Sequence, residues 1–364
     1  MLVGSLEVRD LRSLDRVQVE LPPGITSVVG DNGAGKTSLL EALHFALTGR
    51  SFRTRDPREL IRFGTPVCRA EAGVVAEDGG NHFLLASVSR AQGRRHLLDG
   101  EPVALGQIRR CSPHVAVFSP DLLALVKGPP AERRGYLDRF VAARWPSRSG
   151  LRQEYGQVLA QRNALLRRVE SGLSPRSELD AWDRALVAAA VPLIEARAES
   201  AGELGQRFCE LAAELGLNEA GLAYRPRSDP EADALCAALA QRRDSDLQRV
   251  RTSLGPHLDE LELTVRERSL RRYGSQGEQR AGLLALLLAE REALIQGGSA
   301  PPLMLLDDVM SELDPAHREL LAARMARAGQ ALVSAADPGA LPERLSAHTV
   351  RMPGAAAARL RAVA

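Results

Sequence analysis

The chain has 364 residues, more than twice the roughly 150 residues of a typical domain, so we expect two domains or one large domain with an insertion. Hydrophobic residues make up 45% and charged residues 26% of the sequence, and the formal net charge of +2 excludes a polycation. The longest apolar stretch, Ala281–Ala289, is far below the ~20 residues that a bilayer requires, and the cysteines form no C-x-x-C pair, which excludes a zinc hook.

The first third of the chain has the pattern of short strands around one helix. Apolar residues alternate or cluster in short runs, so we predict strands at residues 2–9, 16–21, 25–29, 68–77, 83–90 and 114–119. A helix is predicted from about Lys36 to Leu47, directly after the third of these strands. Asp99-Gly100 is a hairpin turn signal between later strands.

The character of the chain changes near residue 120. From Asp121 to about Leu254 apolar residues recur at helical spacing, as at Leu151, Tyr155 and Val158. Strands and helices then alternate, with a strand at 261–265, a helix at about 278–295, a buried strand at 303–307, a helix at 315–327 and a strand at 331–335. We therefore expect an α/β domain split in sequence (residues 1–120 and 255–364) and a helical insertion (residues 121–254).

Residues 30–37 read Gly-Asp-Asn-Gly-Ala-Gly-Lys-Thr and fit the phosphate-loop pattern G-x-x-x-x-G-K-[ST]. The predicted strand before the loop and the apolar helix after it supply the context that this motif requires. Glycines let backbone N–H groups surround phosphate oxygens, while the lysine reaches the β- and γ-phosphates and the threonine ligates Mg²⁺. We therefore predict an ATP and Mg²⁺ site formed by Gly30, Asp31, Asn32, Gly33, Ala34, Gly35, Lys36, Thr37 and Ser38, with Lys36 catalytic and Thr37 a metal ligand.

Lysine is nearly absent from this arginine-rich chain. Lys36 and Lys127 are the only lysines among 48 basic residues. Codon bias in a GC-rich genome explains the preference for arginine. A lysine that persists in the phosphate loop therefore indicates a position where arginine does not serve.

An apolar run that ends in two aspartates forms the second half of the predicted site. Residues 302–306 read as a buried parallel strand, and the carboxyl end of such a strand is where an α/β fold places its ligand. We expect Asp307 to hold Mg²⁺ and Asp308 to orient the attacking water or accept its proton. The alternative is that Asp308 merely caps the strand, although a second adjacent carboxylate is costly there unless it is used.

Tyr273-Gly274-Ser275-Gln276-Gly277-Glu278-Gln279 precedes a strongly apolar helix. Ser275 followed three residues later by Glu278 is the signature of a capping box, which gives the segment a purely structural interpretation. A helix N-terminus rich in serine and glycine is also an anion site. The position of the segment between the phosphate loop and the two aspartates favours this second role, so we predict nucleotide contacts from Ser275, Gly277 and Gln279.

A cluster of arginines follows the predicted phosphate-loop helix, interrupted by Asp56 and Glu59. Such clusters make the phosphate contacts that give DNA binding its salt dependence. A solvated arginine-rich loop is an equally good interpretation. The candidate DNA-binding residues are Arg50, Arg53, Arg55, Arg58 and Arg62.

The order of these motifs resembles the ATP-binding-cassette class of ATPases, and the long gap between Lys36 and Ser275 resembles its structural-maintenance-of-chromosomes and Rad50 branch. Within that branch the chain is most similar to the bacterial RecF family of DNA replication and repair proteins. Three further segments carry the similarity: residues 50–54, 120–138 and 255–257. The resemblance implies a Rad50-like and SMC-like ABC-type ATPase head with mixed sheets and an inserted helical arm, and it adds Arg12 to the nucleotide-binding residues.

The resemblance implies that two heads enclose two ATP molecules. Each nucleotide lies on the Lys36 loop of one subunit, and Ser275 and Gly277 of the other subunit complete the γ-phosphate shell. We therefore expect an ATP-dependent homodimer on double-stranded or gapped DNA, with weak ATPase activity. The resemblance alone implies RecO and RecR as partners and RecA loading as the outcome. We expect no signal peptide, no membrane association and a cytoplasmic protein.

Three other functions compete with this one, and one of them, a small-molecule kinase, does not explain the segment at residues 273–279. The ATPase subunit of a membrane transporter has a similar order of motifs, but the long insertion and the arginine-rich loop argue against it. A structural tether of the Rad50 and SMC type needs long coiled-coil legs, whereas two legs of at most ~60 residues would reach only about 90 Å.

Overall fold

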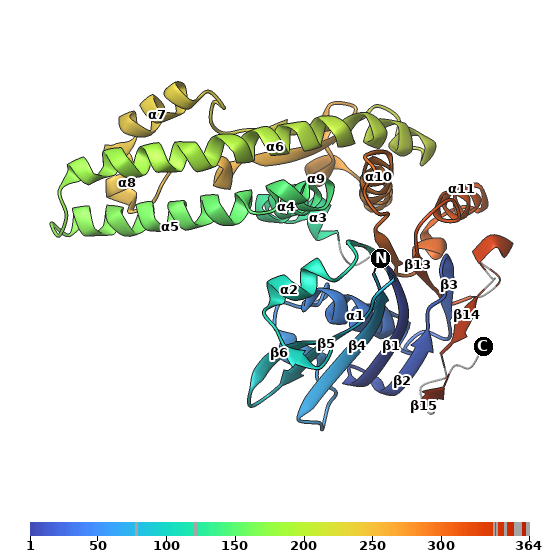
Figure 1. The fold of residues 1–364 in the computed structure, drawn as a ribbon. Coiled ribbons are helices and arrows are strands. Elements are labelled where there is room, and N and C mark those ends of the chain that lie inside the picture. The colour runs from blue at the N-terminus through green and yellow to red at the C-terminus, as the bar shows by residue number, and fades with distance from the viewer. Residues whose placement is uncertain are drawn as a thin grey trace. The chain divides into compact units, whose positions relative to one another are not determined.

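The computed structural model describes residues 1–76, 79–119, 123–337, 339, 341–345, 348–352 and 359–361. The chain divides into two compact units (Figure 1), each described by itself below. Unit 1 comprises residues 1–122 and 300–364, and unit 2 comprises residues 123–299. Among the described residues, no helix combines the length and the apolar character that crossing a bilayer requires.

The chain returns to unit 1 later in the sequence than predicted, after residue 299 instead of residue 254. Residues 255–299 were expected in the split α/β domain, but the structure groups them with the helical part of the chain. The reason is pairing and packing: strand β10 (Glu260–Val265) pairs with β9 (Ala220–Arg225), and helix α10 (Gln276–Gln296) packs against helix α6 (Leu179–Glu214).

A mixed sheet, antiparallel except at one edge, forms one layer of unit 1. Its strand order is β15-β2-β1-β4-β5-β6-β7, and only β15 runs parallel to its neighbour. Val8 of β1 lies opposite Val17 of β2 on one side and Ala70 of β4 on the other. The strands are β1 (Leu2–Leu11), β2 (Leu14–Glu20), β4 (Val67–Val75), β5 (Asn81–Ser89), β6 (Gly93–Leu98), β7 (Glu101–Pro102) and β15 (Arg359–Arg361).

A parallel sheet forms the second layer of unit 1, with strand order β14-β3-β13-β12-β8. The central strands β12 and β13 are buried at every residue, as the continuous apolar runs predict for strands covered on both faces. All carboxyl ends meet at one edge of this sheet. The strands are β3 (Ile25–Val29), β8 (Val115–Phe118), β12 (Leu303–Leu306), β13 (Ala331–Ala335) and β14 (Thr349–Arg351).

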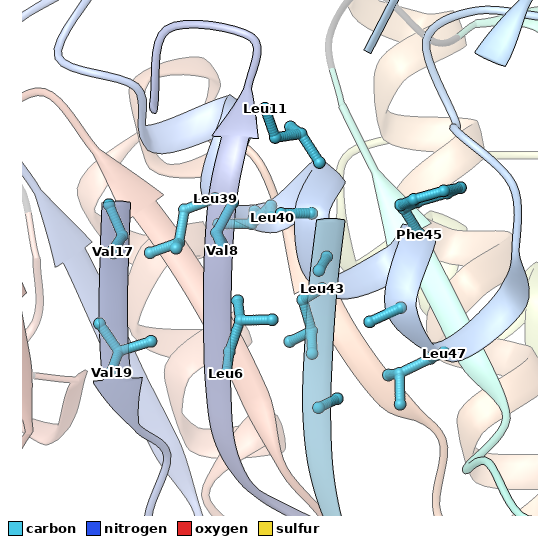
Figure 2. Close-up of a cluster of buried hydrophobic side chains, with 14 of the residues drawn as sticks. Leu6, Val8, Leu11, Val17, Val19, Leu39, Leu40, Leu43, Phe45 and Leu47 are labelled. Carbon is cyan, nitrogen blue, oxygen red and sulfur yellow. The ribbon is translucent and has the colours of Figure 1, made fainter. Parts of the chain in front are cut away.

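Helix α1 (Lys36–Thr48) fills the space against the mixed sheet. It ends at Gly49, whose left-handed backbone closes the last turn with an N–H donated to the Phe45 carbonyl. Figure 2 shows the apolar side chains of α1 and of strands β1 and β2 that form this core: Leu6, Val8, Leu11, Val17, Val19, Leu39, Leu40, Leu43, Phe45 and Leu47. This packing fixes the start of α1, and therefore the phosphate loop, against the sheet.

The remaining helices of unit 1 are short, apart from the helix that follows the acidic strand. They are η1 (Pro57–Leu60), α2 (Leu105–Arg110), η5 (Val309–Glu312), α11 (Pro315–Met325) and η7 (Glu343–Leu345). The predicted helix at 315–327 is thus confirmed as α11, and the predicted strands at 114–119, 303–307 and 331–335 are confirmed as β8, β12 and β13.

Unit 2 is built on two long helices that lie side by side (Figure 1), α5 (Leu151–Glu170) and α6. The region was expected to be helical up to residue 254, and strand β9 within it was missed. Its pairing partner β10 lies outside the local window that a periodicity argument uses. The other elements are α3 (Ala124–Lys127), α4 (Pro130–Arg144), η2 (Pro146–Arg148), η3 (Arg176–Glu178), α7 (Ala232–Gln241), α8 (Arg243–Arg249), η4 (Pro256–Leu258), β11 (Arg268–Ser269) and α9 (Leu270–Tyr273).

Candidate nucleotide site

The loop of residues 30–35 joins β3 to α1 in unit 1. Gly33 and Gly35 have φ angles of +84° and +96°, which side chains rarely adopt. A Cβ atom on Gly35 would also lie 2.7 Å from a methyl group of Leu14. The loop therefore needs glycine at these positions, and its backbone N–H groups gather at the N-terminus of α1, where an anion is favoured.

Lys36 holds its ammonium group at this loop. Its Nζ donates to the carbonyl of Gly30 at 2.7 Å and to the carbonyl of Asp31 at 3.0 Å, and the residue is only 7% exposed. The loop thus presents an ammonium group together with the N–H groups at the start of α1. A set of donors of this kind fits the oxygens of a polyphosphate, so the site fits the predicted nucleotide.

The structure joins the phosphate loop to the acidic strand. The Thr37 hydroxyl donates to the two carboxylate oxygens of Asp307 at 2.9 and 3.0 Å, although the two residues are far apart in sequence. A hydroxyl and a carboxylate are the oxygen ligands that Mg²⁺ prefers. The predicted metal pair therefore fits the ion in both chemistry and position.

Two serines that were not predicted hold the Asp307 carboxylate. Ser334 of β13 donates to Oδ1 at 2.8 Å, and Ser119, which follows β8, donates to Oδ2 at 3.4 Å. Asp307 is 5% exposed, so these hydroxyls compensate for the loss of water around its charge. The sequence carries a signal for both serines, because each is a polar residue within or just after an otherwise apolar strand.

Asp308 adopts a left-handed conformation with φ +48° and ψ +28°. Its backbone N–H donates to the Ser334 hydroxyl at 2.9 Å, so the same serine orients both aspartates. Among the described residues, the Asp308 carboxylate has no hydrogen-bond or ion-pair partner. A half-buried aspartate in a left-handed conformation with such a carboxylate is compatible with a role in hydrolysis, and that role stays a prediction.

Arg12 does not lie in the phosphate loop but pairs with the side chain of Glu41 on α1. Its Nε and Nη2 each donate to a Glu41 oxygen at 3.1 Å, and Glu41 is fully buried. Ser51 and Arg53 also donate to this carboxylate. Glu41 therefore ties α1 to the first hairpin and to the arginine-rich segment, a role that was not predicted. A direct nucleotide contact from Arg12 stays a prediction.

The five candidate DNA-binding arginines are not equally available. Arg62 pairs with Asp15 at 2.9 Å and with Asp10 at 3.8 Å, and Arg53 pairs with Glu41 at 3.4 Å. Acidic partners therefore neutralise the guanidinium groups of Arg53 and Arg62. Arg50, Arg55 and Arg58 are exposed on the surface of unit 1, and their contact with DNA stays a prediction.

Ser275 caps helix α10 in unit 2, as the sequence predicted. Its hydroxyl accepts the N–H of Glu278 at 3.2 Å, and the Glu278 carboxylate accepts the N–H of Ser275 at 2.8 Å. These hydrogen bonds to the carboxylate lower the pKa of Glu278. The first N–H groups of the helix lie beside this cap. Ser275 and Gly277 are both exposed.

Gln279 is placed differently from the prediction. It is buried, and its Nε2 donates to the carbonyl of Leu270 at 3.0 Å. The amide supports the loop that carries Ser275, and a nucleotide contact from Gln279 stays a prediction. The prediction grouped Gln279 with Ser275 because they are close in sequence. Ser275 caps the helix and is exposed, whereas Gln279 lies within the helix and is buried.

The segment at 120–138 begins at residues 120–122, which lie outside the described part of the chain. Further along, Arg133 of α4 forms a two-point ion pair with Glu260 of β10, at 2.6 and 2.8 Å. Arg134 donates to the carbonyl of Asp259 at 2.8 Å. In unit 2 this segment therefore anchors α4 to the strand β10.

Comparison with known proteins gives a family match over almost the whole chain. The family described as the RecF/RecN/SMC N terminal domain matches residues 2–353. A protein from Anaeromyxobacter sp. (strain Fw109-5) named DNA replication and repair protein RecF is 40% identical over 353 residues, which covers 93% of each chain. A protein of the same name from Kineococcus radiotolerans is 35% identical over 390 residues and covers 97% of each chain.

Solved structures give the same fold. The structure of the recombination mediator protein RecF with ATP in the RecFOR pathway has a TM-score of 0.82 and 23% identity, covering 94% of this chain and 93% of that one. An Smc head domain with an extended coiled coil from Pyrococcus furiosus has a TM-score of 0.59 and 18% identity, covering 97% and 94%. The predicted fold class, an ABC-type ATPase head with mixed sheets and a helical lobe, is confirmed.

Proposed function

The chain belongs to the RecF/RecN/SMC N-terminal domain family, and on that premise we propose that it is an ATP-dependent DNA-binding protein of recombinational DNA repair. The observation that carries the proposal is the contact between Thr37 and Asp307. It brings the phosphate loop and the acidic strand into one site that matches the chemistry of ATP and Mg²⁺. The RecF name of relatives that cover most of the chain supports the DNA-repair role.

Each residue of the site has a distinct task in this proposal. Lys36 neutralises the charge of the β- and γ-phosphates, and the N–H groups at the start of α1 orient them. Thr37 and Asp307 would hold Mg²⁺, which supplies further neutralisation of the phosphate oxygens when it is bound. Asp308 accepts a proton from the attacking water, since its carboxylate is free of protein partners among the described residues.

In this proposal, Ser275 and Gly277 contact the nucleotide that is bound to a second copy of the chain. The hydroxyl and the N–H groups at the start of α10 are donors that suit a γ-phosphate, and both residues are exposed. ATP on the Lys36 loop of one subunit then contacts the α10 N-terminus of the other. A ligand that binds only the dimer stabilises the dimer, so ATP controls assembly and hydrolysis reverses it.

We propose slow hydrolysis that times assembly on DNA. The side chain of Asp308 is shorter by one methylene than the glutamate that transporters carry at this place, so it reaches a water less readily. A turnover number below the median enzyme value of about 10 s⁻¹ is expected. By the same family resemblance, the protein would act on gapped DNA with RecO and RecR to promote RecA loading.

The structure does not favour a long tether. Helix α5 has 20 residues and helix α6 has 36. At 1.5 Å per residue these helices extend roughly 30 and 54 Å. Helices of this length are too short for a rod that bridges distant sites.

Ser275→Arg should prevent the ATP-dependent dimer while leaving nucleotide binding intact. The bulky cation replaces a small donor at the N-terminus of α10, and Ser275 lies in unit 2, whereas the phosphate loop lies in unit 1. We would measure sedimentation with and without ATP and a gapped duplex, together with binding of a fluorescent ATP analogue. Ser171→Arg, at an exposed helix end of the same unit, is the matched control. A normal dimer of the Ser275 variant would show that this residue is only a helix cap.

Asp308→Asn should separate hydrolysis from assembly. The amide cannot accept a proton from water, so we expect a loss of turnover of about 100-fold or more. ATP binding and dimer formation should persist, because Lys36, Thr37 and Asp307 are unchanged. Phosphate release and sedimentation measure the two properties separately. Asp99→Asn, in an exposed hairpin of the same unit, should leave both unchanged. Wild-type turnover in the Asp308 variant would assign the proton transfer elsewhere.

A further inference from the structure

A groove of about 730 Å³ lies in unit 2 along strands β9, β10 and β11 and helix α9. Six arginines and three glutamates line it, which gives the groove a net charge of +3. The whole chain has a formal net charge of +2. The groove therefore carries a larger net positive charge than the whole chain.

Some of this charge is neutralised inside the groove. Arg133 is paired with Glu260, and Arg225 is paired with Glu262 at 3.3 Å. Both pairs join neighbouring elements, α4 to β10 and β9 to β10, and they serve to hold the groove together. The remaining charge is what a ligand would meet.

Among the described residues, three exposed arginines of the groove have neither an ion pair nor a hydrogen bond from their side chains, namely Arg227, Arg268 and Arg272. The Nε of a fourth, Arg271, donates to the carbonyl of Lys127 at 3.0 Å. The first three come from three different elements: the loop after β9, the strand β11 and the helix α9. Their backbones are held in place. The N–H of Arg227 donates to the buried Asp259 at 2.8 Å, and Arg268 pairs with Val265 across the tight hairpin. Here and below, these three residues are called the groove arginines.

The groove arginines suit an extended polyanion better than a small anion. A single phosphate group needs donors that converge on one point in a buried pocket. These three side chains are exposed and lie on separate elements, so they can reach successive phosphates along a chain. Tyr273, which is 68% exposed, lies at the same groove and offers a ring to a sugar or a base.

The groove leads to the predicted signature segment. A second hollow of about 330 Å³ shares Arg268 and Tyr273 with the groove and extends to Gly274 and Glu278, beside the cap of α10. Arg272 lies only three residues before Ser275 in the chain. A polyanion in the groove therefore reaches the segment that carries the serine assigned to the partner's nucleotide.

We propose that this groove binds the sugar–phosphate backbone of DNA through the groove arginines, an inference that rests on the proposed function. It adds a DNA-binding surface in unit 2 to the arginine-rich segment of unit 1, where acidic residues neutralise Arg53 and Arg62. The groove has no counterpart in the sequence-based prediction, because its arginines are spread over separate segments of the chain.

The test compares two triple variants of the full chain. Arg227→Ala, Arg268→Ala and Arg272→Ala together remove the groove arginines. Arg167→Ala, Arg168→Ala and Arg249→Ala remove the same charge from exposed positions at the ends of α5 and α8. Fluorescence anisotropy with a labelled duplex and ATP, repeated over a range of salt concentrations, gives the slope of log K against log[salt]. The groove variant should reduce the magnitude of this slope by about 2.7, at about 0.9 for each phosphate that is no longer neutralised, and the control should not change it.

A third variant tests whether charge itself is responsible. Lysine at the same three positions should restore most of the slope, because phosphate contacts need positive charge, whereas a purely structural role of the guanidinium groups would not be rescued. An unchanged slope in the groove alanine variant would overturn the inference, as would an equal reduction in the control. If the wild-type chain itself shows no salt-dependent DNA binding, the proposed function fails instead. Sedimentation with ATP confirms that each variant still assembles.

Discussion

Lys36→Met should abolish ATP-dependent dimer formation and reduce ATP hydrolysis at least about 100-fold, the scale seen when one preorganised charge donor is removed from a transition state. Methionine has a similar length but no charge and no donor. The Lys36 ammonium is 7% exposed and held by two loop carbonyls, so no other basic side chain of the loop can replace it. Nucleotide binding, phosphate release and sedimentation on a gapped duplex measure the three consequences.

The chain provides an unusually clean control, because Lys127 is its other lysine. Lys127 is exposed on unit 2, so Lys127→Met removes the same charge without touching the phosphate loop. It should leave hydrolysis and assembly unchanged. Lys36→Arg should also be inactive, since the larger guanidinium does not fit between the carbonyls of Gly30 and Asp31. Full activity of either Lys36 variant would contradict the assignment of the phosphate loop.

Arg162→Met should destabilise unit 2 by about 3–5 kcal/mol, the range for breaking a buried ion pair by removing one partner. Arg162 is fully buried on α5 and donates at 2.8 Å to Asp183 of α6 and to Asp246 of α8. It also donates to Thr252 at 2.8 Å. The variant leaves the buried carboxylate of Asp246 without its cation, whereas Asp183 keeps its ion pair with Arg243. Three elements of unit 2 are also no longer joined by one side chain.

Tryptophan fluorescence during urea unfolding measures this effect selectively. The two tryptophans, Trp145 and Trp182, both lie in unit 2, and Trp182 is next to Asp183. Arg168→Met, at an exposed position of the same helix, should change the free energy of unfolding by no more than about 0.5 kcal/mol. A similarly small change for Arg162→Met would mean that the buried network is dispensable.

A double variant tests the stated reason for the destabilisation. Adding Asp246→Asn to Arg162→Met removes the carboxylate charge that the first substitution leaves without a cation. The other oxygen of Asp246 accepts from the N–H and hydroxyl of Ser253, and an asparagine oxygen keeps these hydrogen bonds. The double variant should therefore be more stable than Arg162→Met alone, by about 1 kcal/mol or more. A further drop in stability would show that poorer packing, and not an unpaired charge, dominates.

The strand, loop and helix around Lys36 were predicted from the sequence because their signals are local. Gly33, Gly35 and Lys36 follow a strand and open a helix within a few residues, and backbone geometry over such a short range depends on those residues alone. The capping box of Ser275 and Glu278 is local for the same reason. The composition of residues 302–306 also sufficed to predict a buried parallel strand that ends in two acids.

Predictions failed or stayed incomplete where a residue's role depends on a distant partner. Arg12 pairs with Glu41, and Gln279 turns inward to a backbone carbonyl. Strand β9 exists because β10 pairs with it, and that pairing also draws residues 255–299 into unit 2. Periodicity within a window cannot detect such partners, since it reports which face of an element is apolar but not what covers that face.

The sequence by itself determined the phosphate loop, the acidic strand, the α10 cap and the resemblance to a family, because each depends on neighbours in the chain or on a fixed order of motifs. The tertiary structure alone decided that Thr37, Ser119 and Ser334 meet on Asp307. It also decided which arginines are neutralised by acids and which line the groove of unit 2. These outcomes depend on sheet register, burial and pairing between distant segments, which are set only when the chain folds.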